Sequence, residues 1–255
     1  MKILNIQAHP DDAECHCGGT LAKYSERGDE IYYLVCTKGN RGTCDRNLDI
    51  EKLAEIRKKE TLESAKVLGV KDVFFLDGED GFLCPTPELR GKIMQVIRKV
   101  KPEMVMTLDP FLPYEIHPDH RTVGILAAEA VVFACFPHFY PEHLKEGIQP
   151  HFVRELYFYR TREPNYYEDV TLYMERKKRA CYCHESQVIM GGTQRRIATG
   201  DPRSIEELGR ETFDELAVRI SERFGKQIGV KYAEGFKKFE VRAGHLVLEE
   251  DDRTG

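Results

Sequence analysis

Short apolar runs alternate with longer amphipathic stretches through the first half of the chain. The runs are compact and mostly apolar, as is typical of buried strands, and lie at residues 3–8, 31–36, 73–76 and 104–108. Between them, apolar positions recur at helical spacing, and Gly28, Gly69 and Pro87 stand where helices usually end or begin. The pattern predicts helices at residues 18–27, 49–68 and 87–100, the first opened by Gly18 and Gly19.

This alternation predicts an α/β fold. Parallel strands need crossover helices, so we expect a Rossmann-like, mostly parallel sheet with helices on both faces. In such sheets the ligand binds beyond the carboxyl ends of the strands. The 255 residues contain no internal repeat and no low-complexity linker, and we expect one domain over residues 1–255.

The second half of the chain is less regular. Residues 156–159 are expected to form a strand, and residues 172–186 and 204–224 are expected to form helices. Residues 230–241 are expected to be extended. The charged end, residues 249–255, is expected to fray.

Two short polar motifs follow predicted strands. The first is HPDD at residues 9–12, and the second is HPDH at residues 117–120. Both would lie at the carboxyl edge of the sheet. Together they supply the side chains of a catalytic zinc site, which needs three ligands, an open water position and a carboxylate base.

The first motif is expected to give its two aspartates different roles. Pro10 holds His9 extended. The chain must then turn tightly through Asp11 and Asp12, whose side chains cannot point the same way. One aspartate can therefore ligate a metal beside the histidine while the other faces the bound water.

The second motif places two histidines on one helix face. Pro118 suits the first turn of a helix, with His117 and His120 three residues apart, so that one can ligate and the other can meet substrate. Either motif alone has a structural interpretation, as a core histidine or a capping aspartate. Their joint occurrence at two strand ends favours a metal site.

Composition and charge argue against several classes of partner. The formal net charge is −5 and no basic stripe is present, so a small neutral molecule is favoured over nucleic acid or an anionic membrane. The apolar run at residues 123–136 is too short to span a bilayer and contains Glu129. The first strand leaves no room for a signal peptide, and we expect a cytoplasmic protein.

The 8 cysteines do not form zinc knuckles. Cys15/Cys17 and Cys181/Cys183 are C-x-C pairs, and the others are scattered singly. We expect reduced thiols, several of them in the core.

The two motifs resemble the paired signature of the PIG-L (LmbE-like) zinc-dependent N-deacetylases. The likeness covers most of the chain and includes residues 37–39, 57–60, 75–80 and 178–187. Within the family, the chain most resembles the diacetylchitobiose deacetylases, through residues 109–120 (DPFLPYEIHPDH), 163–171 (EPNYYEDVT) and 228–235 (IGVKYAEG). The resemblance implies release of acetate from N-acetylglucosamine or diacetylchitobiose. A branch acting on N-acetylglucosaminyl-malate, in low-molecular-weight thiol synthesis, is the alternative.

The resemblance also implies roles for the motif residues. The implied metal ligands are His9, Asp12 and His120. Asp11 would be the general base, and a protonated His117 would stabilise the oxyanion. Asp119 would orient His117, although a carboxylate is also favoured at a helix start for its charge alone. The implied cofactor is one Zn²⁺ per chain, with Fe²⁺ as the other candidate.

Further residues are expected to contact substrate by resemblance: Arg57, Asp80, His184 and His245. Arg57 could instead belong to a solvated charged face, and Asp80 to an ordinary turn. His184 could be a buried core histidine. His245 stands for a C-terminal histidine that a neighbouring subunit brings to the pocket in the diacetylchitobiose branch. A homo-oligomer, a trimer or hexamer, is implied as well.

Two features depart from the family pattern. Some members place a tyrosine two residues before the first histidine of the HPDH motif, where this chain has Glu115. Residues 190–203 lack a match and are expected to form a mobile loop at the pocket mouth. The alternative from another class is a Rossmann-like nucleotide-binding module without catalysis. It is disfavoured because Gly18 and Gly19 come too late for the glycine-rich turn that binds pyrophosphate.

Overall fold

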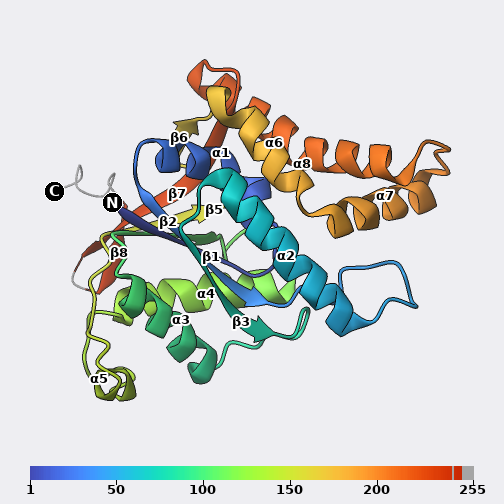
Figure 1. Ribbon diagram of the computed structural model, residues 1–255. Helices are drawn as coiled ribbons and strands as arrows, with labels where there is room; N and C mark the ends of the chain where they lie inside the picture. The colour runs from blue at the N-terminus through green and yellow to red at the C-terminus, as the bar shows by residue number, and fades with distance from the viewer. Residues whose placement is uncertain (243, 249–255) are drawn as a thin grey trace.

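One twisted sheet runs through the computed structural model, which describes residues 1–242 and 244–248 (Figure 1). Its strands are β1 (Lys2–Gln7), β2 (Glu30–Thr37), β3 (Asp72–Gly78), β4 (Met104–Leu108), β5 (Glu155–Tyr159), β6 (Tyr166–Asp169), β7 (Ala233–Arg242) and β8 (His245–Val247). The order is β3-β2-β1-β4-β5-β7-β6, and β8 pairs with β7. Strands β1 to β5 pair in parallel, whereas β6, β7 and β8 pair antiparallel. The mostly parallel sheet expected from the sequence is confirmed.

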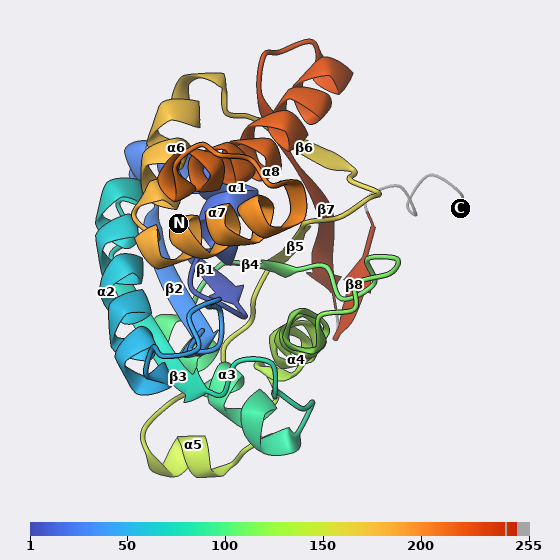
Figure 2. The same cartoon turned by 90° about the vertical axis from the view of Figure 1, so that its right-hand side faces the viewer.

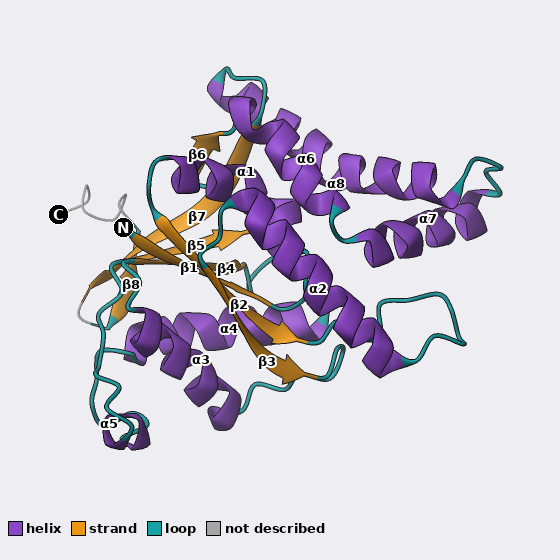
Figure 3. Ribbon diagram, in the orientation of Figure 1, coloured by secondary structure: helices purple, strands orange, loops and turns teal. Residues whose placement is uncertain are grey.

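Helices cover both faces of this sheet (Figure 3). They are α1 (Asp12–Glu26), α2 (Ile50–Leu68), α3 (Pro87–Val100), α4 (Pro118–Phe133), α5 (Glu142–Lys145), the 3-10 turn η1 (Thr171–Tyr173), α6 (Met174–Tyr182), α7 (Glu185–Thr199) and α8 (Ile205–Ile228). Helices α1, α2 and α6 pack together on one face, and α3 packs with α4 on the other (Figure 2). Over the described residues, none of these helices is both long and apolar enough to cross a membrane.

The strand order places a crevice next to β1. The chain leaves β1 for β2 on one side and later returns to β4 on the other side. The connections after β1 and β4 therefore diverge, and such a switch point opens a ligand crevice at the carboxyl ends of the strands. The parallel strands run from left to right in Figure 1, so Figure 2 faces these ends.

The regular elements follow from local sequence chemistry. Ile3, Leu4 and Ile6 are fully buried because β1 is covered on both faces. Helix α3 begins as expected, since the Thr86 hydroxyl accepts the Leu89 N–H at 3.2 Å and proline occupies the first turn.

Helix α1 begins earlier than the sequence predicts. It starts at Asp12 rather than at Gly18, because the Gln7 side-chain carbonyl accepts the Ala13 N–H at 3.0 Å just after β1. The two glycines lie inside the helix. A Cβ atom on Gly19 would stand 2.8 Å from Cβ of Val170, so this glycine permits close packing instead of opening the helix.

The helix expected at residues 204–224 is found as α8, whereas α6 and α7 differ from the prediction. Residues 172–186 do not form one helix. Helix α6 ends at Tyr182, and α7 begins separately at Glu185. The prediction of a mobile loop at residues 190–203 is wrong, because most of this segment belongs to α7, which continues to Thr199. Helices α7 and α8 form a hairpin that extends on the side of the carboxyl ends (Figures 1 and 3). The fraying expected for residues 249–255 lies outside the described residues.

Candidate active site

The first motif forms the turn between β1 and α1. Asp11 has a φ of 109°, which a residue with a side chain rarely adopts, and Asp12 begins the helix. The Asp12 Oδ2 atom accepts the backbone N–H groups of Ala8 at 3.1 Å and His9 at 2.8 Å. Its Oδ1 atom therefore stays available. The two aspartates diverge, as the turn geometry predicted.

The second motif meets the first across the crevice. Pro118 begins α4, and the rings of His117 and His120 stack with their centroids 4.5 Å apart. The His9 ring packs edge-on against both, at 4.6 Å from His117 and 5.1 Å from His120. Residues more than a hundred positions apart thus share one cluster.

Two imidazole nitrogens and the carboxylate of Asp12 lie close to one another. The Nδ1 atom of His9 lies 3.2 Å from Nε2 of His120, which lies 3.5 Å from Oδ1 of Asp12. His9 Nδ1 lies 3.7 Å from the other oxygen of Asp12, Oδ2, which already accepts two backbone N–H groups. Tetrahedral zinc with bonds of about 2.0–2.1 Å spaces its ligand atoms by roughly 3.3–3.4 Å. The donor set therefore fits such an ion and leaves a fourth position open.

Overlapping groups of possible ligands surround His9. One contains His117 and His120, and another contains Asp80, His117 and Asp119. The carboxylates of the second group contact the other ring nitrogen: His9 Nε2 lies 3.0 Å from Asp119 and 3.1 Å from Asp80. This arrangement orients the ring and leaves Nδ1 free for a metal.

Asp119 does not orient His117, contrary to the expectation. Its Oδ1 atom accepts the Leu83 N–H at 3.0 Å, and its Oδ2 atom accepts the Gly81 N–H at 2.6 Å as well as contacting His9. The carboxylate is committed to the loop after β3 and to the histidine of the first motif. Asp119 is therefore a positioning residue for His9.

The charges of the two histidines and Asp12 influence one another inside the buried cluster. Burial opposes the charge of His9, but hydrogen bonds with Asp119, Asp12 and Asp80 hold its pKa well above the usual value. Burial also opposes the charge of His120, and Asp12 raises its pKa. Burial acts against the charge of Asp12, yet the two histidines hold its pKa well below the usual range.

Asp11 forms an ion pair with Arg57. The Arg57 Nη2 atom lies 3.1 Å from Asp11 Oδ2, and Arg57 also donates to the carbonyls of Gly39, at 3.0 Å, and Pro10. The arginine is 2% exposed, so the solvated-face interpretation is wrong. Burial raises the pKa of Asp11, and the guanidinium charge opposes that shift. A raised pKa makes the carboxylate a better proton acceptor.

His117 faces the cavity with its Nδ1 atom buried and without a hydrogen-bond partner. Burial lowers its pKa, as do the charges of His9 and His120. The protonated form expected from the resemblance is therefore disfavoured here. A neutral imidazole can still donate one N–H to a substrate oxygen.

Two residues beside His120 were not predicted as site residues. Glu115 Oε2 lies 3.1 Å from His120 Nδ1, and Arg160 Nη1 lies 2.7 Å from that oxygen and 2.5 Å from the same ring nitrogen. Glu115 was noted only as a departure from the tyrosine pattern. Arg160 directly follows β5, and the rule that sites lie at carboxyl ends of parallel strands was sufficient to find it.

The remaining predicted residues divide between the site and the core. Asp80 lines the cavity, and its Oδ2 atom accepts the Arg41 N–H at 3.2 Å. His184 is fully buried, with Nε2 3.7 Å from Glu14, and does not line the cavity. Burial opposes its charge, but Glu14 raises its pKa. His245 is exposed on β8 and is not brought to this cavity within the chain.

The cavity over the cluster has a volume of about 430 Å³. Its lining residues are His9, Asp11, Asp12, Arg41, Gly42, Arg57, Asp80, Gly81, Phe82, His117, His120, Gln187 and Met190. Gln187 and Met190 lie on α7, so the segment expected to be a loop at the pocket mouth supplies a helical wall. The 8 cysteines are free thiols, as expected, and none lines this cavity.

Comparison with known proteins identifies the family. The model of the PIG-L family, described as GlcNAc-PI de-N-acetylase, matches residues 4–131. The chain is 40% identical over 236 residues to the diacetylchitobiose deacetylase of Thermococcus kodakarensis, covering 92% of this chain and 82% of that protein. It is 30% identical to the probable N-acetyl-alpha-D-glucosaminyl L-malate deacetylase 2 of Bacillus anthracis, and this match covers 83% of this chain and 93% of that protein.

A solved structure agrees with the sequence comparison. The N,N'-diacetylchitobiose deacetylase from Pyrococcus horikoshii, complexed with its inhibitor MPG, superimposes with a TM-score of 0.84 at 37% identity. The match covers 98% of this chain and 88% of that one. The chain belongs to the PIG-L family.

Proposed function

We propose that this protein is a metal-dependent hydrolase that removes the acetyl group from an N-acetylglucosamine-type sugar and releases acetate. The observation that carries the proposal is the convergence of His9, Asp12 and His120 beside Asp11 at the switch point of the sheet. Membership of the PIG-L family and the likeness to diacetylchitobiose deacetylases support it.

The donor set is suited to zinc. Two imidazole nitrogens and one carboxylate oxygen are common ligands of catalytic Zn²⁺, and Fe²⁺ accepts the same set. We propose one ion per chain, held by His9, Asp12 and His120. When bound, it would act as a Lewis acid that lowers the pKa of water at the open position and polarises the amide carbonyl.

The chain's own residues then divide the proton transfers. Asp11 accepts the proton of the attacking water, and its ion pair with Arg57 fixes the carboxylate toward the cavity. His117 donates an N–H to the carbonyl oxygen as negative charge develops there. Asp11 can pass its proton to the leaving nitrogen, so that one water and one amide become acetate and a free amine.

The substrate is proposed to be N-acetylglucosamine or diacetylchitobiose, and Arg57 and Asp80 line the cavity where its hydroxyls would bind. N-acetylglucosaminyl-malate is the second candidate substrate, because the chain is also similar to the Bacillus deacetylase named for it. Acetate release from each compound by the purified, zinc-loaded protein tests the assignment. We expect the largest kcat/KM on diacetylchitobiose or its monomer. The largest value on the malate compound would favour the second candidate, and no release from any of them would contradict deacetylation.

We also propose a homo-oligomer, a trimer or hexamer, on the strength of the family resemblance. Light scattering after size-exclusion chromatography measures the mass directly. A monomer of 29.4 kDa would contradict this part and would remove the role suggested for His245.

A further inference from the structure

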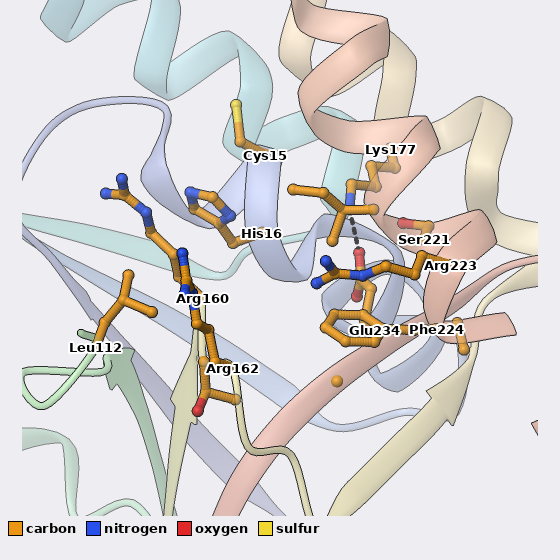
Figure 4. Close-up of a pocket in the computed structure, with 14 residues that line it drawn as sticks. Cys15, His16, Leu112, Arg160, Arg162, Lys177, Ser221, Arg223, Phe224 and Glu234 are labelled. Carbon is orange, nitrogen blue, oxygen red and sulfur yellow. Dashed lines mark hydrogen bonds and ion pairs between the residues drawn. The ribbon is translucent and has the colours of Figure 1, made fainter. Parts of the chain in front are cut away.

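A second cavity lies beside the candidate active site and shares none of its lining residues. It has a volume of about 130 Å³ and lies among α1, the chain after β5, α8 and the start of β7. Figure 4 shows Arg160 and Arg162 on one side of it, and Lys177, Arg223 and Glu234 on the other. This space is far below the roughly 300–1,000 Å³ of sites for drug-sized ligands. It suits a small ligand.

The single carboxylate among the lining residues is already neutralised. Glu234 Oε1 lies 2.6 Å from Lys177 Nζ and accepts the Gly19 N–H at 3.0 Å, and its Oε2 atom accepts the Thr20 N–H at 2.7 Å. Glu234 and Lys177 are 2% and 1% exposed, so the pair is closed off from water. Their charges cancel, and the remaining charge of the cavity comes from arginines.

The arginines leave this cavity with an excess of positive charge. Arg160 is paired with Glu115 at 2.7 Å. Within the described part of the chain, the structure gives no ion pair to Arg162 or Arg223, and Arg223 instead lies 5.1 Å above the Phe224 ring. Two guanidinium groups thus border a small cavity without a carboxylate partner, in a protein whose net charge is −5.

We propose that this cavity binds a small oxyanion, a carboxylate or a phosphate group, between Arg162 and Arg223. The planar guanidinium group presents paired N–H donors that match these anions and that carry charge at every physiological pH. Arg160 links the two cavities, because it lines this one and also contacts His120. An anion here competes with Glu115 for that guanidinium.

Calorimetric titration tests the site with two probes, sodium acetate and sodium phosphate, at constant ionic strength. Each is titrated into the zinc-loaded protein and into chelator-treated protein. The informative variant is Arg162→Gln combined with Arg223→Gln, since both side chains are exposed and neither belongs to the proposed catalytic machinery. The matched control is Arg219→Gln, an exposed arginine of α8 that pairs with Glu215 at 3.2 Å and does not line the cavity.

We expect one saturable site for at least one of the two anions. Its affinity should fall by about tenfold or more in the double variant, because two charge-assisted contacts are lost, and should stay unchanged in the control. Chelation should not abolish binding. Tighter binding of acetate would indicate a carboxylate ligand, and tighter binding of phosphate a phosphorylated one.

Three outcomes would overturn the proposal: no saturable binding of either anion, equal affinity in the double variant and the wild type, or binding that disappears with the metal. The last would place the anion on the metal site. None of these measurements depends on deacetylation, so the cavity and the proposed function stand or fall separately.

Discussion

Asp11 shows how a single residue departs from local preference for a chemical purpose. Its φ of 109° costs on the order of 1–3 kcal/mol for a residue with a side chain. The surroundings hold it there, because Pro10 precedes it, Asp12 begins a helix and Arg57 pairs with its carboxylate. The strained turn directs Asp11 and its neighbour to different partners.

Asp11→Asn should abolish deacetylation while metal binding is retained. The amide keeps the size of the side chain but cannot accept a proton, and general base catalysis usually contributes about 10²–10⁴-fold. The measurements are kcat on diacetylchitobiose and the zinc-to-protein ratio. Full activity at a normal metal content would refute the role of Asp11 as base.

Asp119→Asn should weaken metal binding. The carboxylate orients the His9 ring through Nε2, and loss of such a partner typically lowers metal affinity about 10–100-fold. Competition with a chelator measures the affinity, and Asp72→Asn, an exposed aspartate at the start of β3, is the control. A drop in kcat with unchanged metal affinity would instead return Asp119 to the role of orienting His117.

At the scale of elements, the sequence predicts the first half well. The strands of the parallel sheet and helices α2 and α3 lie within a few residues of their expected bounds, because apolar runs and end signals are local. Helix α8 also lies within a few residues of its expected bounds, whereas α6 and α7 were not predicted as separate helices. At the break before α7, His184 precedes the helix and its buried ring lies 3.7 Å from Glu14, a contact between distant residues. Tertiary contacts decide such boundaries.

The α7–α8 hairpin depends on a glycine contact. A Cβ atom on Gly192 would overlap the carbonyl oxygen of Ile205, and one on Gly191 would meet only Thr212 at 3.6 Å. Gly192→Ala should therefore lower the free energy of unfolding by about 1–3 kcal/mol through overpacking. Gly191→Ala should be neutral or slightly stabilising, since alanine favours helix. Thermal unfolding followed by circular dichroism measures both, and equal effects would contradict this packing.

At the scale of the whole molecule, topology explains how much of the site was predictable. The two motifs were found because both follow strands that a parallel sheet brings to one edge. The contacts that each side chain makes within the site were not predicted. Asp119 was assigned to His117 and contacts His9, and Arg160 was not predicted at all. Such pairings depend on side-chain directions that no sequence spacing specifies.

Metal affinity should fall as the pH is lowered. The pKa values of His9 and His120 are raised in the metal-free protein, so protons compete with a metal for these imidazoles up to a higher pH than they would for a free imidazole. Raising the pH removes this competition, and lowering it strengthens it. Zinc affinity measured between pH 6 and 8, with proton release followed in buffers of different ionisation enthalpy, checks the sign. A pH-independent affinity would contradict the raised pKa values of the two histidines.

The most direct test of the metal site is anomalous diffraction at the zinc edge from crystals soaked in zinc chloride. We expect one peak per chain, about 2.0–2.2 Å from Nδ1 of His9, Nε2 of His120 and a carboxylate oxygen of Asp12. A peak on the Nε2 side of His9, between Asp80 and Asp119, or no peak at saturating zinc, would contradict the proposed metal site and the hydrolytic mechanism built on it.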